Sequence, residues 1–338
     1  MKIALDTHPA APAEHYIQHL AKLLARHAPQ HEYFTDGESD ESFDIYHGFR
    51  SGAPAAPRLR HAVTVFTVSD LRFLRFPHLF DLSERLFGLR RYRQALRSAA
   101  RVIALNTPAR EELAERLQVD RRKIEVMLPL GALAPRTPPS EEELRFVRRK
   151  YALPDEFVLM VGPTDGRCHQ PRVFEALLAT GLPSGFVVCG RRSPCSNRLL
   201  NLARERRAAD RIDFVYESEP REFTAFFHLA RVFVQLSDAD AEASIVPVVE
   251  ALRAGVPMLL NDTPVNRETA GPAALYVRPD TPGELTAALR LALRDEPLRR
   301  ELRLRERQRA RLFSEQAVAQ RLADLYASLP RSLSDSGF

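Results

Sequence analysis

The sequence lacks long apolar runs and has few cysteines. No apolar stretch approaches the length of a bilayer span, and Met1–Ala11 does not have the pattern of a secretory signal peptide. The three cysteines, Cys168, Cys189 and Cys195, are odd in number and lack the spacing of a zinc site, which favours reduced thiols buried as small apolar residues. These absences predict a cytoplasmic protein without a membrane span or a structural zinc.

Lysine is also scarce. It occurs only at positions 2, 22, 123 and 150, so nearly all of the 49 basic side chains are arginines. Arginine binds phosphates through a planar fork and does not act as a base. The formal net charge of +5 fits nucleic acid, an anionic membrane or a phosphate-rich substrate, and it equally fits the amino-acid usage of a GC-rich genome. Charge alone therefore selects no partner.

Short apolar runs alternate with amphipathic stretches along the whole chain. Such alternation favours parallel sheets covered by helices on both faces, with ligands at the carboxyl ends of the strands. The fold class is therefore predicted to be α/β. The predicted strands are Lys2–Asp6, Phe43–Tyr46, Ala62–Val68, Val102–Leu105, Lys123–Met127, Phe157–Gly162, Gly185–Gly190, Arg211–Val215, Val232–Leu236, Pro257–Leu260 and Ala274–Val277.

A change in composition divides the chain, which with 338 residues is most simply two domains. Prolines and a glycine gather between Pro129 and Pro139 and indicate a linker, with the boundary near residue 135. We expect one domain at residues 1–134 and a second at residues 135–313. Residues 314–331 are predicted to form a terminal helix, and residues 332–338 a disordered tail.

The most informative stretch runs from Ser237 to Gly255. It follows the apolar run Val232–Leu236, which predicts a buried strand. It leads into a helix whose start is predicted at Pro247, since proline suits a first helical position, and whose end is predicted at Gly255. A loop at the carboxyl end of a strand is thus followed directly by a helix start.

Two carboxylates flank this helix start. Glu242 lies in the loop before the helix, and Glu250 lies about one turn inside it. The backbone N–H groups of Ser244, Ile245 and Val246 are predicted to be free, as in a typical anion site. Carboxylates beside an anion site suit a ligand that has phosphates and hydroxyls, such as a nucleotide-sugar. Alternatively, Glu250 complements the helix dipole and Glu242 is a solvated loop residue.

The spacing Glu-x7-Glu, with Pro247 between the two acids and Ala251–Pro257 after them, resembles the hallmark of the family 4 (group 1) glycosyltransferases. The resemblance implies the GT-B fold, in which two Rossmann-like parallel-sheet domains face each other across a cleft. The first domain would take the acceptor and the second the nucleotide-sugar donor, and the helix at residues 314–331 would cross back to the first domain. It also implies retention of anomeric configuration without a metal or a cofactor.

Several positions differ from the family pattern. Ser69 stands where the family has a histidine after a strand, and Arg167 and Cys168 stand where its phosphate turn has arginine and lysine. Ala243 and Ile245 replace glycines of the central loop, and the first turn of the chain has no glycine. A hydroxyl at position 69 can donate a hydrogen bond to a sugar but cannot carry the charge of an imidazolium.

The resemblance implies a role for each matching residue. Glu242 is expected to contact the transferred sugar and Ser69 to hydrogen-bond it, which makes these two the catalytic candidates. Glu250 is expected to bind the ribose, and Arg167 with the amides of Ser244–Val246 the diphosphate. The donor would be a UDP- or GDP-sugar, and the enzyme would be hexosyltransferase-like. The acceptor would be a glycan or a lipid-linked molecule of polysaccharide biosynthesis.

A basic stretch from Arg72 to Arg101 carries arginines beside aromatic residues. It fits peripheral contact with the anionic inner face of a membrane, which would suit a lipid-linked acceptor. The alternative is an ordinary solvated helix, because Leu86, Leu89 and Leu96 already provide it with a core-facing side.

Three other functions compete with an active enzyme of this family. The replaced positions favour a non-catalytic GT-B homologue that acts as a binding or scaffold partner. The tripeptide Asp238–Asp240 has the Asp-x-Asp pattern of metal-dependent GT-A transferases, although it lies late in the chain. Nucleic-acid binding is not expected, because the sequence has neither interleaved aromatics nor a recognisable module.

Overall fold

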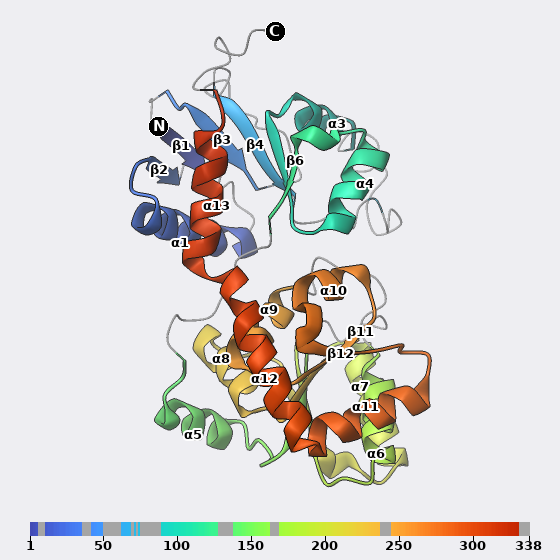
Figure 1. Ribbon diagram of the computed structural model, residues 1–338. Helices are drawn as coiled ribbons and strands as arrows, with labels where there is room; N and C mark the ends of the chain where they lie inside the picture. Colours follow the sequence, from blue (N-terminus) through green and yellow to red (C-terminus); the bar gives the residue numbers. More distant parts are fainter. Residues whose placement is uncertain are drawn as a thin grey trace. The chain divides into compact units, whose positions relative to one another are not determined.

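The computed structural model describes residues 1–5, 11–35, 42–49, 62–68, 71, 74, 89–127, 138–162, 169–236 and 245–330. The chain divides into two units, which are drawn in Figure 1. Unit 1 comprises Met1–Leu130 together with Leu312–Phe338, and unit 2 comprises Gly131–Arg311. Each unit contains a six-stranded parallel sheet with helices, so the predicted α/β class with two parallel-sheet domains is confirmed.

The strands of unit 1 are β1 (Lys2–Leu5), β2 (Glu32–Thr35), β3 (Ile45–Gly48), β4 (Val63–Val68), β5 (Arg101–Ala104) and β6 (Ile124–Val126). Their order in the sheet is β2-β1-β3-β4-β5-β6. Successive residues of a strand point to opposite faces. Ile45 accordingly joins one apolar cluster and Tyr46 another, so both faces of the sheet are buried.

The helices of unit 1 are α1 (Ala11–His27), α3 (Leu89–Ser98), α4 (Thr107–Leu117) and α13 (Glu315–Ala327), with the 3-10 helix η4 (Arg121–Lys123). α1 and α13 pack together on one face, where Leu20 and Leu322 share a cluster with Ile45. α3 and α4 cover the other face through Leu96 and Leu113. α13 therefore completes the core of unit 1, although it follows unit 2 in the chain.

The strands of unit 2 are β7 (Phe157–Val161), β8 (Gly185–Cys189), β9 (Ile212–Val215), β10 (Val232–Gln235), β11 (Met258–Asn261) and β12 (Ala274–Val277). Their order is β12-β11-β10-β7-β8-β9, again with every neighbouring pair parallel. The helices are α5 (Glu141–Lys150), α6 (Gln170–Ala179), α7 (Pro194–Glu205), α8 (Pro220–Leu229), α9 (Ile245–Ala254), α10 (Pro264–Ala270), α11 (Pro282–Arg294) and α12 (Glu296–Ala310), with η5 (Ala209–Arg211), η6 (Gly271–Ala273) and η7 (Arg311–Phe313).

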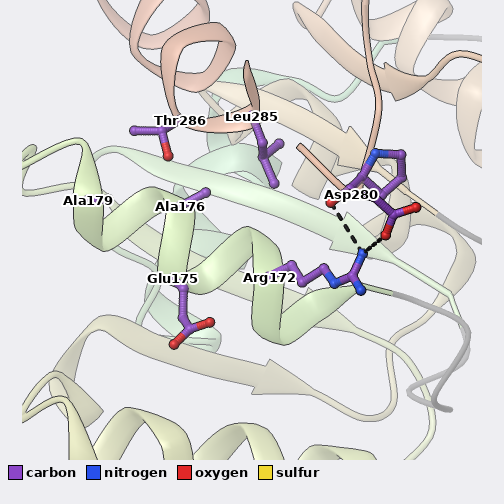
Figure 2. A pocket seen from close by; sticks show the side chains of 8 residues that line it. Arg172, Glu175, Ala176, Ala179, Asp280, Leu285 and Thr286 are labelled. Atoms are coloured by element: carbon purple, nitrogen blue, oxygen red, sulfur yellow. Dashed lines mark hydrogen bonds and ion pairs between the residues drawn. The ribbon is translucent and has the colours of Figure 1, made fainter. Parts of the chain in front are cut away.

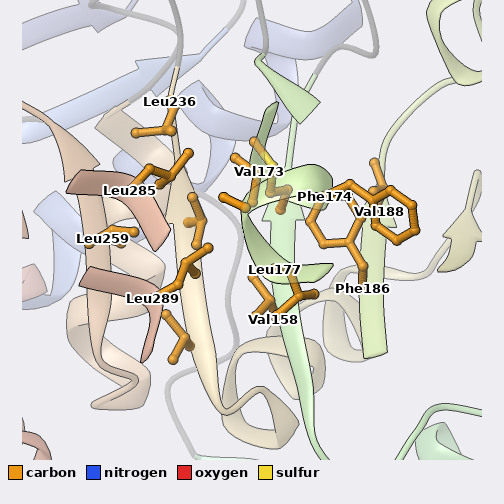
Figure 3. Close-up of a cluster of buried hydrophobic side chains, with 14 of the residues drawn as sticks. Val158, Val173, Phe174, Leu177, Phe186, Val188, Leu236, Leu259, Leu285 and Leu289 are labelled. Atoms are coloured by element: carbon orange, nitrogen blue, oxygen red, sulfur yellow. The ribbon is translucent and has the colours of Figure 1, made fainter. Parts of the chain in front are cut away.

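One face of the second sheet is covered by α6, α7 and α11. Figure 3 shows this core, in which Phe174 of α6 and Leu289 of α11 lie against the strand residues Val158 and Leu259. On the opposite face the ring of Phe227 in α8 lies 5.2 Å from that of Phe233 in β10. Helix α9 packs against α8, α10 and α12 and so shares that second face.

One strand and two helices have a weak signal in the sequence. β2 is an edge strand whose residues are only partly buried, so it has no apolar run to reveal it. α6 begins directly after the turn predicted to bind phosphate, at Gln170, and α10 lies within a stretch interpreted only as a family motif. α10 is short, with its start capped by the side chain of Thr263, and short helices give a weak periodic signal.

Basic side chains from neighbouring segments cap the carboxyl ends of several helices. Arg290 donates to the carbonyl of Thr180 at the end of α6, at 3.2 Å. Arg309 donates to the backbone carbonyl of Thr269 in α10 at 2.8 Å, and Lys123 donates to the backbone carbonyl of Arg97 in α3 at 3.2 Å. The last carbonyls of a helix have no partner within the helix, so these donors satisfy groups that would otherwise lose hydrogen bonds on burial.

The predicted basic helix is described only in part. α3 covers its second half, where Tyr92 and Leu96 are buried as the core-facing side. Arg90 and Arg97 are exposed, and most of residues 72–88 lie outside the described residues. Within the described ranges, no helix is both long enough and apolar enough to cross a membrane.

The buried carboxyl group of Glu306 in α12 should make the stability of the fold depend on pH. Its side chain is 0% exposed, and neither oxygen has a hydrogen-bond partner among the described residues. Burial raises its pKa to about 8, against the opposing charges of Arg303 and Arg299. Because the folded pKa exceeds the ordinary value of 4.5, the protonated acid stabilises the fold at low pH, and this contribution is lost as the pH rises through 8.

Glu306→Gln should therefore stabilise the protein at high pH, because the amide has the shape of the protonated acid but never ionises. The gain in free energy of unfolding should be small at pH 4.5 and grow by about 1.4 kcal/mol or less per pH unit towards pH 8. Urea unfolding at a series of pH values measures it. Glu301→Gln, an exposed change on the same helix, should alter stability by at most about 1 kcal/mol. A gain that does not depend on pH would contradict the assignment.

Candidate functional site

The strand order of unit 2 has a switch point between β7 and β10. β7 and β10 are neighbours, with Val232 opposite Val158. From β7 the chain continues to β8 on one side, and from β10 it continues to β11 on the other side. Ligands of open α/β sheets bind outside the carboxyl ends of the strands where the order reverses in this way.

The two segments that the sequence marks for donor binding begin at these adjacent strand ends. The predicted phosphate turn with Arg167 follows β7, and the loop with Glu242 and Ser244 follows β10. Arg167, Glu242 and Ser244 lie outside the described residues, and so does Ser69, which follows the end of β4 in unit 1. The topology brings the starting points of both segments of unit 2 to one edge, and the roles of these four residues stay predictions.

Helix α9 begins at Ile245, two residues before the predicted start at Pro247. The prediction of the start is therefore corrected. The N–H groups of the first turn have no acceptor within a helix, so proline is tolerated at the third position of α9 as well as at the first. Ile245 and Val246 are the first two helical residues, and their N–H groups lack intrahelical partners, as an anion site requires.

Glu250 lies in α9 with a buried side chain. The residue is 2% exposed, and the alternative in which it complements the helix dipole stays open. Oε1 lies 3.6 Å from Nη1 of Arg253, and neither carboxyl oxygen has a hydrogen-bond partner in the described part of the chain. Burial raises the pKa of the Glu250 carboxyl, and the charge of Arg253 opposes part of that rise.

The direction of this side chain matters for the site. Side chains of a helix lean towards its amino terminus, so Glu250 leans towards the start of α9 at the carboxyl edge of the sheet. A buried carboxyl without hydrogen bonds costs free energy until a donor arrives. Hydroxyl groups of a ligand bound at the start of α9 are donors of the right kind.

Two glycines shape the same edge. Gly162 follows β7 with a positive φ of 133°, and its N–H donates to the carbonyl of Cys189 at 3.0 Å. A Cβ atom at Gly190, the residue after β8, would overlap the carbonyl oxygen of Gly162. The backbones of Gly162 and Gly190, which follow β7 and β8, therefore lie so close together that only glycine fits at position 190.

A surface cavity of about 410 Å³ lies between α6 and α11 (Figure 2). Its charged side chains already have partners. Arg172 pairs with Asp280 and also donates to the carbonyl of Pro279, and Glu175 pairs with Arg206 at 2.6 Å. Glu250 does not line this cavity.

Other predicted groups are located as follows. Cys189 is buried and Cys195 is partly exposed, both as free thiols, while Cys168, Asp238 and Asp240 lie outside the described residues. Burial raises the pKa of the Cys189 thiol. In the ranges that the structure describes, no group of three or more His, Cys, Asp or Glu side chains could hold a metal ion.

Comparison with known proteins bears on unit 2 most directly. Residues 145–310 match the family model for glycosyl transferases group 1. The matched range lies within unit 2 and includes α9 with Glu250. No curated protein sequence matches the chain significantly.

Solved structures match over nearly the whole chain. Sucrose-phosphate synthase from Thermosynechococcus elongatus is similar at 19% identity and a TM-score of 0.68, over 97% of this chain and 98% of that one. HepE from Anabaena, solved in complex with UDP and glucose, is similar at 14% identity and a TM-score of 0.73, over 97% and 100%. WaaG, a glycosyltransferase involved in lipopolysaccharide biosynthesis, is similar at 14% identity and 0.67, over 97% and 100%. At these identities the likeness shows the fold, which is the GT-B fold of glycosyltransferases.

Gly190→Ala should destabilise the edge where β7 and β8 end. The added methyl group would press on the backbone of Gly162, which cannot rotate away as a side chain could, and overpacking of this kind costs about 1–3 kcal/mol. Urea unfolding measures the loss. Gly283→Ala is the matched control, because a Cβ there meets no atom within 4 Å, and it should cause no loss. Equal effects of the two substitutions would contradict the close approach.

Proposed function

We propose that this protein is a glycosyltransferase that moves a sugar from a nucleoside-diphosphate sugar to a glycan or lipid-linked acceptor. The reaction retains the anomeric configuration and needs no metal. The observation that carries the proposal is Glu250, a buried carboxyl without a hydrogen-bond donor in the described chain, in a helix that follows β10 within the range that matches glycosyl transferases group 1. The complexes of HepE with UDP-glucose and with UDP and glucose support a nucleotide-sugar as donor.

Each proposed contact uses a different chemistry of the donor. The Glu250 carboxyl accepts hydrogen bonds from the ribose hydroxyls. The N–H groups of Ile245 and Val246, together with Ser244 and Arg167, hold the diphosphate. A helix start carries about half a positive charge, and each charge-assisted hydrogen bond contributes about 1.5–3 kcal/mol, so these groups stabilise the negative charge of the leaving diphosphate.

The remaining predicted contacts concern the sugar and the acceptor. Glu242 contacts the transferred sugar, and Ser69 donates a hydrogen bond to it. The donor is a UDP- or GDP-hexose, and polysaccharide biosynthesis is the process that such an activity would serve. Exposed Arg90 and Arg97 on α3 support contact with the anionic inner surface of a membrane, where a lipid-linked acceptor would lie.

Donor binding tests the proposal. The unfolding temperature of the purified protein is followed in the presence of four donors, which are UDP-glucose, UDP-galactose, UDP-N-acetylglucosamine and GDP-mannose. At least one donor should stabilise the protein, by about 2.7 kcal/mol at a concentration of 100 Kd. Glu250→Gln should weaken that donor at least about tenfold, because it removes charge-assisted hydrogen bonds. The difference between wild type and Glu250→Gln should disappear with the 2′,3′-dideoxyribose form of the donor.

Glu306→Gln is the matched control, since it alters another buried glutamate of unit 2 to which no donor contact is assigned, and it should leave donor affinity unchanged. The outcomes separate the competing functions. A folded protein that no donor stabilises contradicts the proposal. Donor binding without sugar transfer identifies the non-catalytic homologue, and activity that a chelator abolishes identifies a metal-dependent transferase. The anomeric configuration of the product, read by NMR, tests retention.

Membrane contact has its own test. The double substitution Arg90→Glu with Arg97→Glu should weaken binding to phosphatidylglycerol vesicles at low salt by about tenfold or more, because each basic residue near an anionic surface contributes about 1 kcal/mol. Cosedimentation measures it. Arg300→Glu with Arg307→Glu changes two exposed arginines of α12 by the same charge and should bind like wild type. If the wild-type protein does not bind the vesicles, membrane contact is contradicted, and the proposal for the donor site is unaffected.

A further inference from the structure

A buried histidine lies at the carboxyl edge of the sheet in unit 1. The order β2-β1-β3-β4-β5-β6 reverses between β1 and β3, so the crevice of this unit lies outside their carboxyl ends. His47 is the next-to-last residue of β3, and Thr67 is the next-to-last residue of β4. Both therefore lie at the edge where ligands of such sheets bind.

His47 joins this edge to the terminal helix. Its Nδ1 lies 2.6 Å from the hydroxyl of Tyr326 in α13, and its Nε2 lies 2.7 Å from Oγ1 of Thr67. The ring also stacks on Phe49 with centroids 4.1 Å apart. These contacts form one continuous chain of hydrogen bonds, Tyr326–His47–Thr67, which we call the relay.

The relay holds a neutral imidazole in one orientation. His47 is 0% exposed, and burial lowers its pKa to about 3. A neutral ring has one N–H and one lone pair, and a hydroxyl can either donate or accept, so both ring nitrogens are satisfied. Because both nitrogens are engaged by protein, His47 itself has no group left to offer a substrate.

The relay is surrounded by apolar side chains, among which buried polar groups are not expected. The same face of the sheet is otherwise apolar, with Leu5, Ile45 and Val65 packed under α1 and α13. An apolar side chain at position 47 would extend this cluster without the cost of burying polar groups. The polar groups appear at the end of the strands, and the chain leaves Thr67 through Val68 directly to Ser69.

We propose that His47 is a positioning residue for sugar transfer. Through Thr67 and Tyr326 it joins the carboxyl ends of β3 and β4, the edge of this sheet where ligands bind, to α13. This role rests on the proposed glycosyltransferase function. Its consequence is that loss of the relay impairs the transfer step and leaves donor binding, which belongs to unit 2, unchanged.

The test uses the full-length protein with small deletions of single hydroxyls. Thr67→Val and Tyr326→Phe each remove one end of the relay with little change in shape. The probe is UDP-glucose, or whichever of the four donors stabilises wild type most, and transfer to water is followed by nucleotide release. Both variants should lower kcat at least tenfold while KM and donor Kd stay within threefold. His47→Gln, which supplies one donor and one acceptor, should retain more kcat than His47→Leu.

Matched controls remove the same groups elsewhere in unit 1. Tyr33→Phe deletes a hydroxyl that donates to the carbonyl of Ala28 at 3.0 Å, and Thr64→Val changes another threonine of β4. These variants should keep the wild-type kcat. Relay variants that lose no more kcat than the controls would overturn the positioning role, as would a loss confined to donor Kd. The positioning role is also overturned if wild type binds a donor but releases no nucleotide. If wild type binds no donor, both the proposed function and the positioning role are overturned.

Discussion

The pairing of β7 with β10 is the constraint on which the proposed site depends. Because the chain leaves these neighbours in opposite directions, α6 and α9 cover opposite faces of the sheet and both begin at its carboxyl edge. Two helix starts, each with a partial positive charge, therefore flank one crevice. Glu250 is a buried acceptor within α9, one of these two helices. A ligand with phosphates and hydroxyls matches this combination, whereas a purely cationic ligand or a purely apolar one does not.

The arginine content has a structural explanation that charge counting does not reveal. A fold with helices on both faces of each sheet has many helices, and the carboxyl-terminal end of each one leaves carbonyls without intrahelical partners. Arg290 and Arg309 satisfy such carbonyls from neighbouring helices, and Arg299 reaches the carbonyl of Ala292 at 2.9 Å although its own side chain is buried. A long side chain with several donors suits this task. Much of the basic charge therefore serves the fold, and only part of it is free for phosphates or membranes.

The sequence predicts the sheets well because buried parallel strands are apolar on both faces. Runs such as Phe157–Val161 are recognisable for that reason, whereas the edge strand β2 is not. Glu250 could be nominated from its spacing, but its burial arises from α8, α10 and α12, which pack around α9. The relay could not be predicted at all, because Tyr326 and His47 are 279 positions apart. Glu242, Arg167, Ser244 and Ser69 remain nominated by sequence alone.

The return of the chain to unit 1 has a consequence for its synthesis. All strands of unit 2 emerge from the ribosome before α13 does, so unit 2 can close its core while translation continues. Unit 1 cannot, because Leu322, Leu325 and Tyr326 cover strands that precede unit 2 in the chain. One face of its sheet therefore lacks the apolar cover of α13 until that helix has been synthesised. A nonsense mutation just ahead of α13 would leave a folded carboxyl-terminal half attached to an aggregation-prone partner.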